Sequence, residues 1–178
     1  MEISDNQLVS RILKGDTNTF ATLVDRYNSQ IFNLMYRYSG STEEAADMTQ
    51  DVFLKSFEKL ESYREQRFFS WLYTLALNHA KDWSRKRQTN EQKLARLKHD
   101  SSTNEQHASG ELESQQENTS LLKALETLSP DNKEMVLLKY QHDHSIRELS
   151  EIFNLSESAV KMRLHRSLAE VRTVLTGD

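Results

Sequence analysis

The sequence predicts an all-α protein, made of two small helical domains joined by a flexible polar linker, with a helix-turn-helix in the C-terminal domain. Three observations support this prediction. The 178 residues include only four Gly and one Pro, so few turns interrupt the helix-forming residues. Apolar side chains recur at helical spacing in two blocks. Between them, residues 99–120 have Ala108 and Leu112 as their only sizeable apolar residues.

The N-terminal block, residues 1–90, is predicted to form one domain of four helices. Apolar residues at helical spacing place these helices at about 8–13, 20–38, 41–60 and 68–87. The third helix opens with a capping box. In this arrangement Ser41 accepts a hydrogen bond from the backbone amide of Glu44, whose carboxylate accepts one from the amide of Ser41. We therefore expect that helix to begin directly after Ser41.

Residues 91–118 are predicted to be a flexible linker. Within them, residues 99–118 carry five acidic and no basic side chains and are dominated by Ser, Glu, Gln and Asn. Such a segment buries too little apolar surface to fold alone. A flexible chain of about 30 residues spans roughly 30 Å on average and about 100 Å when stretched. The linker could therefore connect two DNA sites that lie one or two helical turns apart.

The C-terminal block, residues 119–178, is predicted to form a second helical domain. A helix over about 121–128 comes first, and Ser129 as N-cap with Pro130 at the first helical position begins the next one. That second helix is expected to end near residue 140. A helix-turn-helix then fills most of the remaining sequence.

The first helix of this helix-turn-helix has a start and an end that the sequence marks. Ser145 and Glu148 form another capping box. Asn154, a residue type that tolerates left-handed backbone, stands where the helix must end after about two turns. Ser156 is then the N-cap of the second helix. Two helices joined by so short a turn suit a protein that reads the major groove of DNA.

The second helix of the motif has one face that packs and one face that is exposed, at 100° per residue. The packing face holds Val160, Leu164, Ser167 and Val171. The exposed face holds Ser158, Lys161, Met162, His165 and Arg166. An exposed basic stripe is often only a solvated surface. Because it follows a capped first helix and a tight turn, DNA contact is the preferred interpretation here.

The third helix of the N-terminal block is also two-faced. Its packing face holds Ala45, Thr49, Val52, Phe53, Ser56 and Leu60. Its other face holds Asp47, Gln50, Asp51, Leu54 and Glu58. An exposed leucine within an acidic stripe has the composition of a docking site for a basic protein surface. An ordinary solvated face with one stray leucine has the same composition, so both interpretations stay open.

The fourth helix carries side chains that suit unpaired bases. It packs through Phe68, Leu72, Leu75, Ala76, His79 and Trp83, and His79 is predicted to be structural. Beside this stripe lie Trp71, Thr74, Asn78, Lys81, Asp82 and Arg85, and the preceding loop adds Tyr63 and Arg64. An aromatic ring can stack on a base while Asn and Arg bind base edges and Lys binds phosphate. A tryptophan at helical spacing is more often part of the core than a platform for a base, so that interpretation stays open.

The charge distribution limits how the chain can bind DNA. The net charge is −4, and positive charge exceeds negative charge in two islands, with seven basic against two acidic residues in 81–98 and four against three in 155–178. Because phosphate contacts supply most of the affinity for duplex DNA, the chain alone should bind it weakly. We expect a larger partner to hold it on DNA.

Several classes of function are not expected. No window approaches eighteen apolar residues, and the first residues, MEISDNQ, lack the pattern of a signal peptide, which predicts a cytoplasmic protein that does not insert into membranes. The absence of Cys excludes disulfides and thiolate metal sites. His142, Asp143 and His144 lie too close together on one loop to supply three metal ligands readily. No metal, cofactor, catalytic residue or small-molecule substrate is expected.

Four sequence stretches, in their order and spacing, resemble one family. They are ADMTQDVFLKSF, FFSWLYTLALNHAKDWSRKR, LSPDNKEMVLLKY and HSIRELSEIFNLSESAVKMRLHRSLAEVR. They are similar to the extracytoplasmic-function (ECF) subgroup of bacterial RNA polymerase sigma factors in the sigma-70 family, over nearly the whole chain outside the linker. The resemblance implies a protein that is not an enzyme. It would bind core RNA polymerase, recognise the −10 and −35 promoter elements, help to melt the duplex, and have an anti-sigma factor as a partner.

The resemblance also implies roles for individual residues. Residues 1–90 would be sigma region 2 and residues 119–178 sigma region 4, with the linker near the RNA exit path of the polymerase. Docking on the coiled-coil clamp helices of the largest polymerase subunit would involve Asp47, Gln50, Asp51 and Leu54. The −10 element would meet Tyr63 and Arg64, in the loop that receives an extruded base, and Trp71, Asn78, Lys81, Asp82 and Arg85. The −35 element would meet Ser156, Ser158, Lys161, Met162, His165 and Arg166.

The chain departs from the family pattern at a few positions. The family usually has an acidic residue followed by Leu where this chain has Asp47 and Met48, which is a conservative apolar exchange. It often has Gly at the position of Asn154 and Pro-Val-Gly-Thr where this chain has the residues from Ser156 to Ala159. Glu157 would repel phosphate unless it accepts a hydrogen bond from a cytosine amine, so we expect it to affect promoter choice.

Two alternative functions remain on the sequence alone. A stand-alone helix-turn-helix regulator would need a dimer interface or an effector pocket to set its half-site spacing, and the N-terminal block suggests no pocket. A helical adaptor that binds only proteins would leave the exposed basic stripe and the base-binding side chains without a role.

Overall fold

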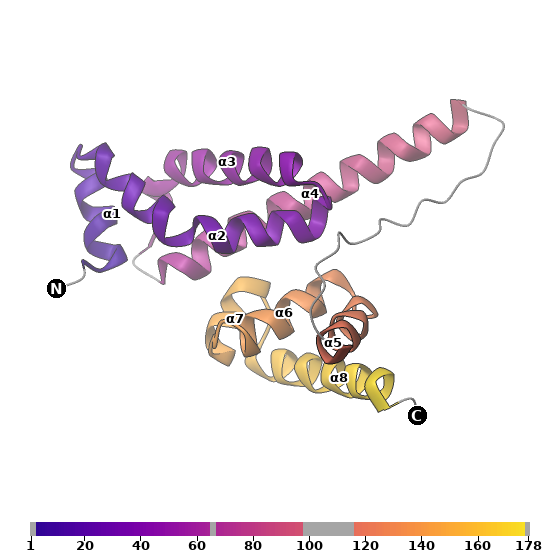
Figure 1. Cartoon of the computed structure of the whole chain (residues 1–178). Helices are drawn as coiled ribbons and strands as arrows, with labels where there is room; N and C mark the ends of the chain where they lie inside the picture. The colour runs from indigo at the N-terminus through magenta and orange to yellow at the C-terminus, as the bar shows by residue number, and fades with distance from the viewer. Residues whose placement is uncertain (1–2, 65–66, 98–115, 177–178) are drawn as a thin grey trace. The chain divides into compact units, whose positions relative to one another are not determined.

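The computed structural model describes residues 3–64, 67–97 and 116–176, and these residues form helices with no strand. They belong to two compact units, Met1–Ser109 and Gly110–Asp178. The predicted all-α class is therefore confirmed. In the first unit (Figure 1) the elements are α1 (Asp5–Leu13), the 3-10 turns η1 (Thr17–Thr19) and η2 (Leu60–Ser62), α2 (Phe20–Ser39), α3 (Thr42–Glu58) and α4 (Phe68–Leu97). In the second unit they are α5 (Gln116–Glu126), α6 (Pro130–Tyr140), α7 (Ile146–Phe153) and α8 (Glu157–Thr176).

The core of the first unit forms where α2 packs against α3 and α4, which also pack against each other. Apolar residues three and four positions apart place one stripe of α2 on both neighbours. The fully buried side chains of this core include Leu23, Ile31, Leu34 and Met35 of α2, Val52 of α3, and Phe68, Leu72 and Tyr73 of α4. This packing fixes the two helices whose other sides carry the predicted binding residues.

The turn between α2 and α3 is built from local backbone chemistry. Gly40 caps α2 with left-handed backbone (φ 71°), and its amide donates to the carbonyl of Tyr36 at 2.8 Å. Ser41 Oγ then accepts from the amide of Glu44 at 3.4 Å, which is one half of the predicted capping box. The Glu44 carboxylate lies 3.7 Å from Arg87 of α4, so this side chain connects α3 to α4.

The first helix is held against the rest of the unit by polar contacts. Asp5 pairs with Arg26 and accepts a hydrogen bond from the Tyr27 hydroxyl. Burial raises the pKa of Tyr27 above its ordinary value, and the hydrogen bond to Asp5 raises it further. One residue along, Asn6 Oδ1 accepts from the Tyr63 hydroxyl at 2.6 Å. These contacts attach α1 to α2 and to the residues that follow η2.

Helix α4 is longer than the sequence pattern predicted. We expected it to end near residue 87, but it continues to Leu97 and extends past the N-terminal start of α3 (Figure 1). Arg87 Nε pairs with Glu91 at 3.0 Å, and its NH1 donates to the carbonyl of Ser39 at 3.2 Å. The predicted linker 91–118 therefore begins with helix up to residue 97 and ends with helix from residue 116. Its central part, 98–115, lies outside the described residues.

The second unit packs α5, α6 and α7 around one side of α8. Fully buried side chains include Ala124 of α5, Leu138 of α6, Leu149 of α7 and Val160 of α8. The predicted boundaries differ mainly at α5, which begins at residue 116 instead of 121. Pro130 is at the start of α6 as predicted. Ser129 precedes it, but among the described residues its hydroxyl makes no capping hydrogen bond.

The predicted helix-turn-helix is confirmed in its local geometry. Both halves of the capping box are present at the start of α7, with Ser145 Oγ accepting from the Glu148 amide at 3.2 Å and Glu148 Oε2 accepting from the Ser145 amide at 2.7 Å. Asn154 ends α7 with φ 51° and ψ 51°, the left-handed conformation that the sequence predicted. Ser156 Oγ accepts from the amide of Ala159 at 3.2 Å and caps α8.

Candidate protein- and nucleic-acid-binding surfaces

Helix α3 presents the exposed surface that its sequence predicted, which we call the α3 face. Its members are Asp47, Gln50, Asp51, Leu54 and Glu58, and all of them are exposed. Leu54 is 56% exposed and is the one apolar member of this face. The six residues predicted to pack are all buried, and Met48 joins them in the core. The two-faced pattern of this helix is therefore confirmed.

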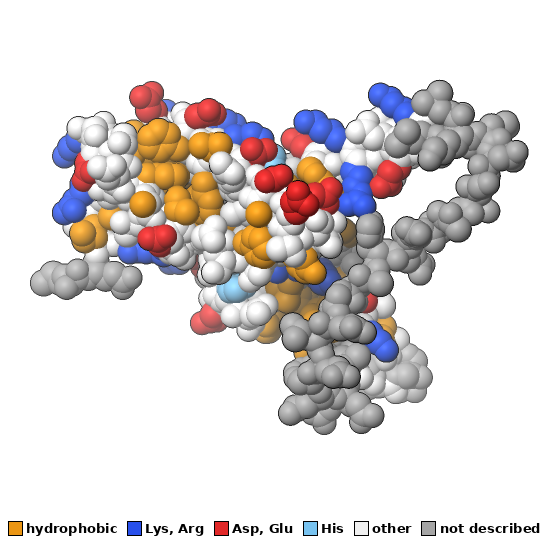
Figure 2. Space-filling view, turned by 45° about the horizontal axis from the view of Figure 1, so that its top comes forward, with side chains coloured by type: hydrophobic (Ala, Val, Ile, Leu, Met, Phe, Trp, Pro, Cys, Tyr) orange, Lys and Arg blue, Asp and Glu red, His pale blue; other side chains and the backbone are white. Residues whose placement is uncertain are grey.

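An apolar groove between α2 and α3, which was not predicted from the sequence, lies beside Leu54. It has a volume of about 600 Å³ and is lined by Phe20, Val24, Asn28, Phe32, Ala46, Thr49, Gln50, Phe53, Leu54 and Phe57. The rings of Phe20 and Phe57 meet edge to face at 5.1 Å, and Phe57 is 40% exposed. Figure 2 shows hydrophobic side chains gathered on one face of this unit, with charged side chains around them. We call this feature the α2–α3 groove.

The sequence did contain a pattern that could have revealed this groove. Phe20, Val24, Asn28 and Phe32 are spaced four residues apart on α2, and so form a stripe that is separate from the core stripe of Leu23, Ile31 and Leu34. In the sequence, the apolar residues of this helix served only to mark its length, and the two stripes were not distinguished. Two apolar stripes on one helix predict one contact within the domain and a second contact surface.

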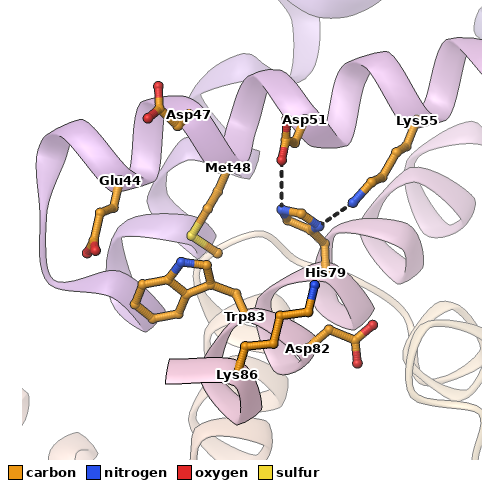
Figure 3. A pocket seen from close by; sticks show the side chains of 9 residues that line it. All are labelled: Glu44, Asp47, Met48, Asp51, Lys55, His79, Asp82, Trp83 and Lys86. Atoms are coloured by element: carbon orange, nitrogen blue, oxygen red, sulfur yellow. Dashed lines mark hydrogen bonds and ion pairs between the residues drawn. The ribbon is translucent and has the colours of Figure 1, made fainter. Parts of the chain in front are cut away.

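A second cleft lies between α3 and α4 (Figure 3), and we call it the α3–α4 cleft. It has a volume of about 360 Å³ and is lined by Glu44, Asp47, Met48, Asp51, Lys55, His79, Asp82, Trp83 and Lys86. His79 points from α4 towards α3. Its Nδ1 lies 2.8 Å from Lys55 Nζ, and its Nε2 lies 3.8 Å from Asp51 Oδ2.

The environment of His79 favours the neutral imidazole. Burial lowers the pKa of His79 below its ordinary value of 6.5, and the positive charge of Lys55 lowers it further. Asp51 acts in the opposite direction but more weakly. His79 was predicted to be a structural residue, and its side chain is indeed only 15% exposed. Its position between two charged residues of α3 was not evident from the sequence.

The aromatic residues predicted to meet the −10 element lie together, but one of them is in the core. Trp71 is half-buried, with its ring 5.4 Å from Tyr63 and 5.5 Å from Phe68. Tyr63 was expected in an exposed loop. It is only 7% exposed, because its ring packs against both Phe68 and Trp71 while its hydroxyl donates to Asn6. Tyr63 therefore packs against Trp71 and does not itself present a free aromatic surface.

The polar members of the same flank are at the surface of α4. Asn78, Asp82 and Arg85 are exposed, and Lys81 is half-buried. Arg85 NH1 donates to Asp82 Oδ1 at 3.1 Å, one turn back along the helix. Arg64, after η2, is exposed as well. The residues that follow it, 65–66, lie outside the described ranges.

Helix α8 presents the basic stripe that the sequence predicted. The residues predicted for this stripe are all exposed, namely Ser156 at the N-cap and Ser158, Lys161, Met162, His165 and Arg166, and the opposite residues Val160, Leu164, Ser167 and Val171 are all buried. The hydroxyls of Ser156 and Ser158 lie 3.0 Å apart at the start of the helix. Met162 is 52% exposed within this polar surface. The stripe therefore faces solvent over about three helical turns.

The described residues show neither a metal site nor a membrane-spanning helix. Within residues 3–64, 67–97 and 116–176, no group of three or more His, Asp or Glu side chains is arranged to hold a metal ion. Over the same residues, no helix combines the length and the apolar character that crossing a membrane requires.

Comparison with known proteins identifies the family of this chain. The family model for sigma-70 region 2 matches residues 23–90, and the model for sigma-70 region 4 matches residues 118–171. The chain is 31% identical to the ECF RNA polymerase sigma factor SigW of Bacillus subtilis (strain 168), over 98% of both sequences. The chain belongs to the ECF sigma factors of the sigma-70 family. It is also 29% identical to the ECF RNA polymerase sigma-E factor of Haemophilus influenzae, over 93% of this sigma factor and 92% of that protein.

Solved structures share the fold of this sigma factor. CnrH in complex with the cytosolic domain of CnrY superposes with a TM-score of 0.70 and 22% identity, over 98% of both chains. RpoE from Bartonella quintana in complex with the anti-sigma factor NepR gives a TM-score of 0.68 and 22% identity, over 89% of this chain and 98% of that one.

Membership of this family establishes the general activity. The protein binds RNA polymerase and promoter DNA and directs promoter-specific initiation of transcription. Region 2 corresponds to the first unit and region 4 to the second, and the match to region 2 begins within α2, so that α1 precedes the matched part.

Proposed function

We propose that this sigma factor docks on core polymerase through the α3 face and the α2–α3 groove, binds the −10 element with one flank of α4, and reads the −35 element with α8. The observation that carries this proposal is the division of α3 and α8 into one fully buried and one fully exposed face. In both helices the exposed face holds the residue types that its expected partner requires.

The docking surface combines an apolar centre with an acidic margin. Leu54 and Phe57 are 56% and 40% exposed, and they border the α2–α3 groove. Asp47, Asp51 and Glu58 lie on the same side of α3. Apolar anchors supply most of the affinity of an interface, and the surrounding charge selects the partner. By the family resemblance, the partner is the coiled-coil clamp of the largest polymerase subunit, which would offer apolar and basic side chains.

The −10 site combines stacking with hydrogen bonding. An unpaired base would stack on the accessible part of Trp71, while Asn78 and Arg85 bind base edges and Lys81 binds phosphate. Tyr63 would hold Trp71 in orientation, because it is buried and packs against that ring. Asp82 would orient Arg85, and Arg64 would contact the extruded base or its phosphate. Capture of unpaired bases lowers the free energy of the open duplex, which is how binding at this site would favour melting.

The −35 site is the exposed stripe of α8. Arg166 and Lys161 can donate to the acceptors of guanine in the major groove, and His165 and Met162 can contact neighbouring base edges. Ser156 and Ser158, at the helix N-terminus, would bind a phosphate. Glu157 would discriminate in favour of a cytosine amine.

The remaining parts of the proposal concern the setting in which the protein works. It would act as a non-enzymatic initiation factor in the cytoplasm, where the polymerase is. An anti-sigma factor would regulate it, since the RpoE structure with a similar fold contains an anti-sigma factor. Residues 1–90 would suffice for polymerase docking and for binding the −10 element, and residues 119–178 would suffice for binding the −35 element.

Core polymerase binding of a double variant tests the docking proposal. Asp51→Arg with Leu54→Ala reverses one charge and removes the apolar anchor, so the Kd for core polymerase should rise at least about 100-fold. Leu13→Ala with Glu43→Arg makes the same chemical changes at exposed positions outside the α3 face and should bind as the wild type does. Both variants should keep the thermal unfolding midpoint of the wild type. Unchanged co-purification of the Asp51/Leu54 variant would remove the docking proposal.

A further inference from the structure

His79 lies between two oppositely charged residues of α3 (Figure 3). Asp51 and Lys55 are four positions apart and therefore on the same side of that helix. The imidazole enters from α4, with Nδ1 2.8 Å from Lys55 Nζ and Nε2 3.8 Å from Asp51 Oδ2. One ring thus contacts the cation through one nitrogen and approaches the anion with the other.

The donor and acceptor capacities of these groups fix the proton on the ring. A Lys ammonium can only donate, so Nδ1 must accept and carries no proton. The neutral ring then carries its proton on Nε2, which is the nitrogen nearest Asp51. The geometry therefore requires the neutral form, and the side chain is only 15% exposed, which favours the same form.

In the absence of His79, Lys55 would have a different partner. Residues with opposite charges at positions i and i+4 of a helix pair with each other. In the described part of the chain, Lys55 contacts His79 and forms no ion pair with Asp51. The side chain of Asp51 is 60% exposed. Its carboxylate, at the edge of the α3 face, is consequently not paired with Lys55.

We propose that His79 is a positioning residue for polymerase docking, which in its neutral form holds the Lys55 ammonium away from Asp51 and so leaves that carboxylate available to the polymerase. This inference rests on the proposed docking role of the α3 face. His79 belongs to α4, the helix proposed to bind the −10 element. A residue of α4 would thus affect the charge of the docking surface on α3.

Protonation of His79 would reverse this arrangement. An imidazolium cannot accept from Lys55 and repels it, while it attracts Asp51. Once released from Nδ1, the Lys55 ammonium would be able to pair with Asp51. The His79 imidazolium and the Lys55 ammonium would then both offset the charge of that carboxylate. The other charged groups of the α3–α4 cleft are Asp82 and Lys86 of α4, which have opposite effects on His79, and Glu44 and Asp47 of α3. Because burial and Lys55 lower the pKa of His79 below 6.5, docking should be insensitive to pH above 7 and should weaken as the pH falls below 6.5.

The experiment measures the Kd between the full chain and core polymerase at pH 7.5 and at pH 5.8. His79→Ala should bind about threefold more weakly than wild type at pH 7.5, because Lys55 is then able to pair with Asp51. Lys55→Gln added to His79→Ala should restore the wild-type Kd, since no lysine remains to neutralise Asp51. His79→Gln can accept from Lys55 and donate to Asp51 without titrating, so it should lack the acid-induced loss seen for wild type.

The variants separate this inference from the docking proposal on which it rests. If the double variant His79→Ala, Lys55→Gln binds as weakly as His79→Ala, then His79 acts only through packing and the inference is overturned. An equal loss of affinity in acid for wild type and His79→Gln would also overturn it. Asp51→Asn provides the separate control: if it binds as tightly as wild type, the docking role of Asp51 is wrong, whatever the histidine variants do.

Discussion

Arg166 has the properties of a side chain that reads a base. It is exposed on α8, on the side opposite the buried residues Val160, Leu164 and Val171. A guanidinium can donate two parallel hydrogen bonds to guanine, and each such contact discriminates between bases by about 1 to 3 kcal/mol. Arg166 is therefore the residue of this stripe whose loss should change sequence preference most.

Arg166→Ala should weaken holoenzyme binding by about 1 to 3 kcal/mol, with the loss concentrated at one position of the −35 element. Binding of the holoenzyme to a set of promoters with single base changes would measure this profile. Arg172→Ala, an exposed arginine further along α8, is the matched control and should leave the profile unchanged. A loss that is equal for all sequences would instead make Arg166 a phosphate contact.

Single residues also show where prediction from sequence fails. All the residues assigned to the exposed stripe of α8 are exposed, because helical periodicity determines which residues share a face. Tyr63 has no such periodicity, since it lies between η2 and α4. Its burial depends on Asn6, which is 57 positions away, and on the ring of Phe68. The charge environment of His79 likewise comes from another helix and could not be predicted from the spacing within α4.

The elements of region 4 depend on how α7 ends. Asn154 adopts φ 51°, a conformation that costs an ordinary residue about 1 to 2 kcal/mol and costs glycine almost nothing. Asn154 changes the direction of the chain at the end of α7, two residues before Ser156, which caps α8. The orientation of the exposed stripe relative to α7 therefore depends on one left-handed position.

Asn154→Ala should lower the free energy of unfolding of region 4 by about 1 kcal/mol, whereas Asn154→Gly should change it by less than about 0.5 kcal/mol. Native-state hydrogen exchange of the full chain would measure this at the amides of α7 and α8, with the amides of α3 as an internal control. Equal effects of Ala and Gly would show that the Asn154 side chain, and not its backbone conformation, stabilises the turn.

The ends of the helices were predicted less well than their faces. Residues 88–97 have no apolar stripe, so periodicity gave no reason to extend α4 beyond Arg87. They also contain no Gly or Pro, and continuing a packed helix avoids the cost of nucleating a new one. The pair between Arg87 and Glu91 supports the first turn of this extension. The α2–α3 groove was not predicted for a related reason, because helical spacing was used to place α2 and its two apolar stripes were not distinguished.

The whole molecule is acidic, and it has two islands in which basic residues outnumber acidic ones, seven against two and four against three. One lies in residues 81–98 and one in residues 155–178, and the net charge of the chain is −4. Few phosphates can be neutralised by either island alone, so neither unit should hold duplex DNA tightly. When the protein is bound to the polymerase, the sites for the −10 and −35 elements would bind DNA together. Binding at one site then raises the effective concentration of the other site at the same promoter.

Binding of a promoter duplex by the chain alone, by core polymerase alone and by both together tests this account most directly. At physiological salt the chain alone should bind no more tightly than the nonspecific range, with a Kd of about 1 μM or weaker, and the mixture should form a specific complex at least about 1,000-fold tighter. The Asp51→Arg, Leu54→Ala variant should lose that gain. Tight, sequence-specific binding by the chain alone, with no increase on addition of core polymerase, would contradict the account.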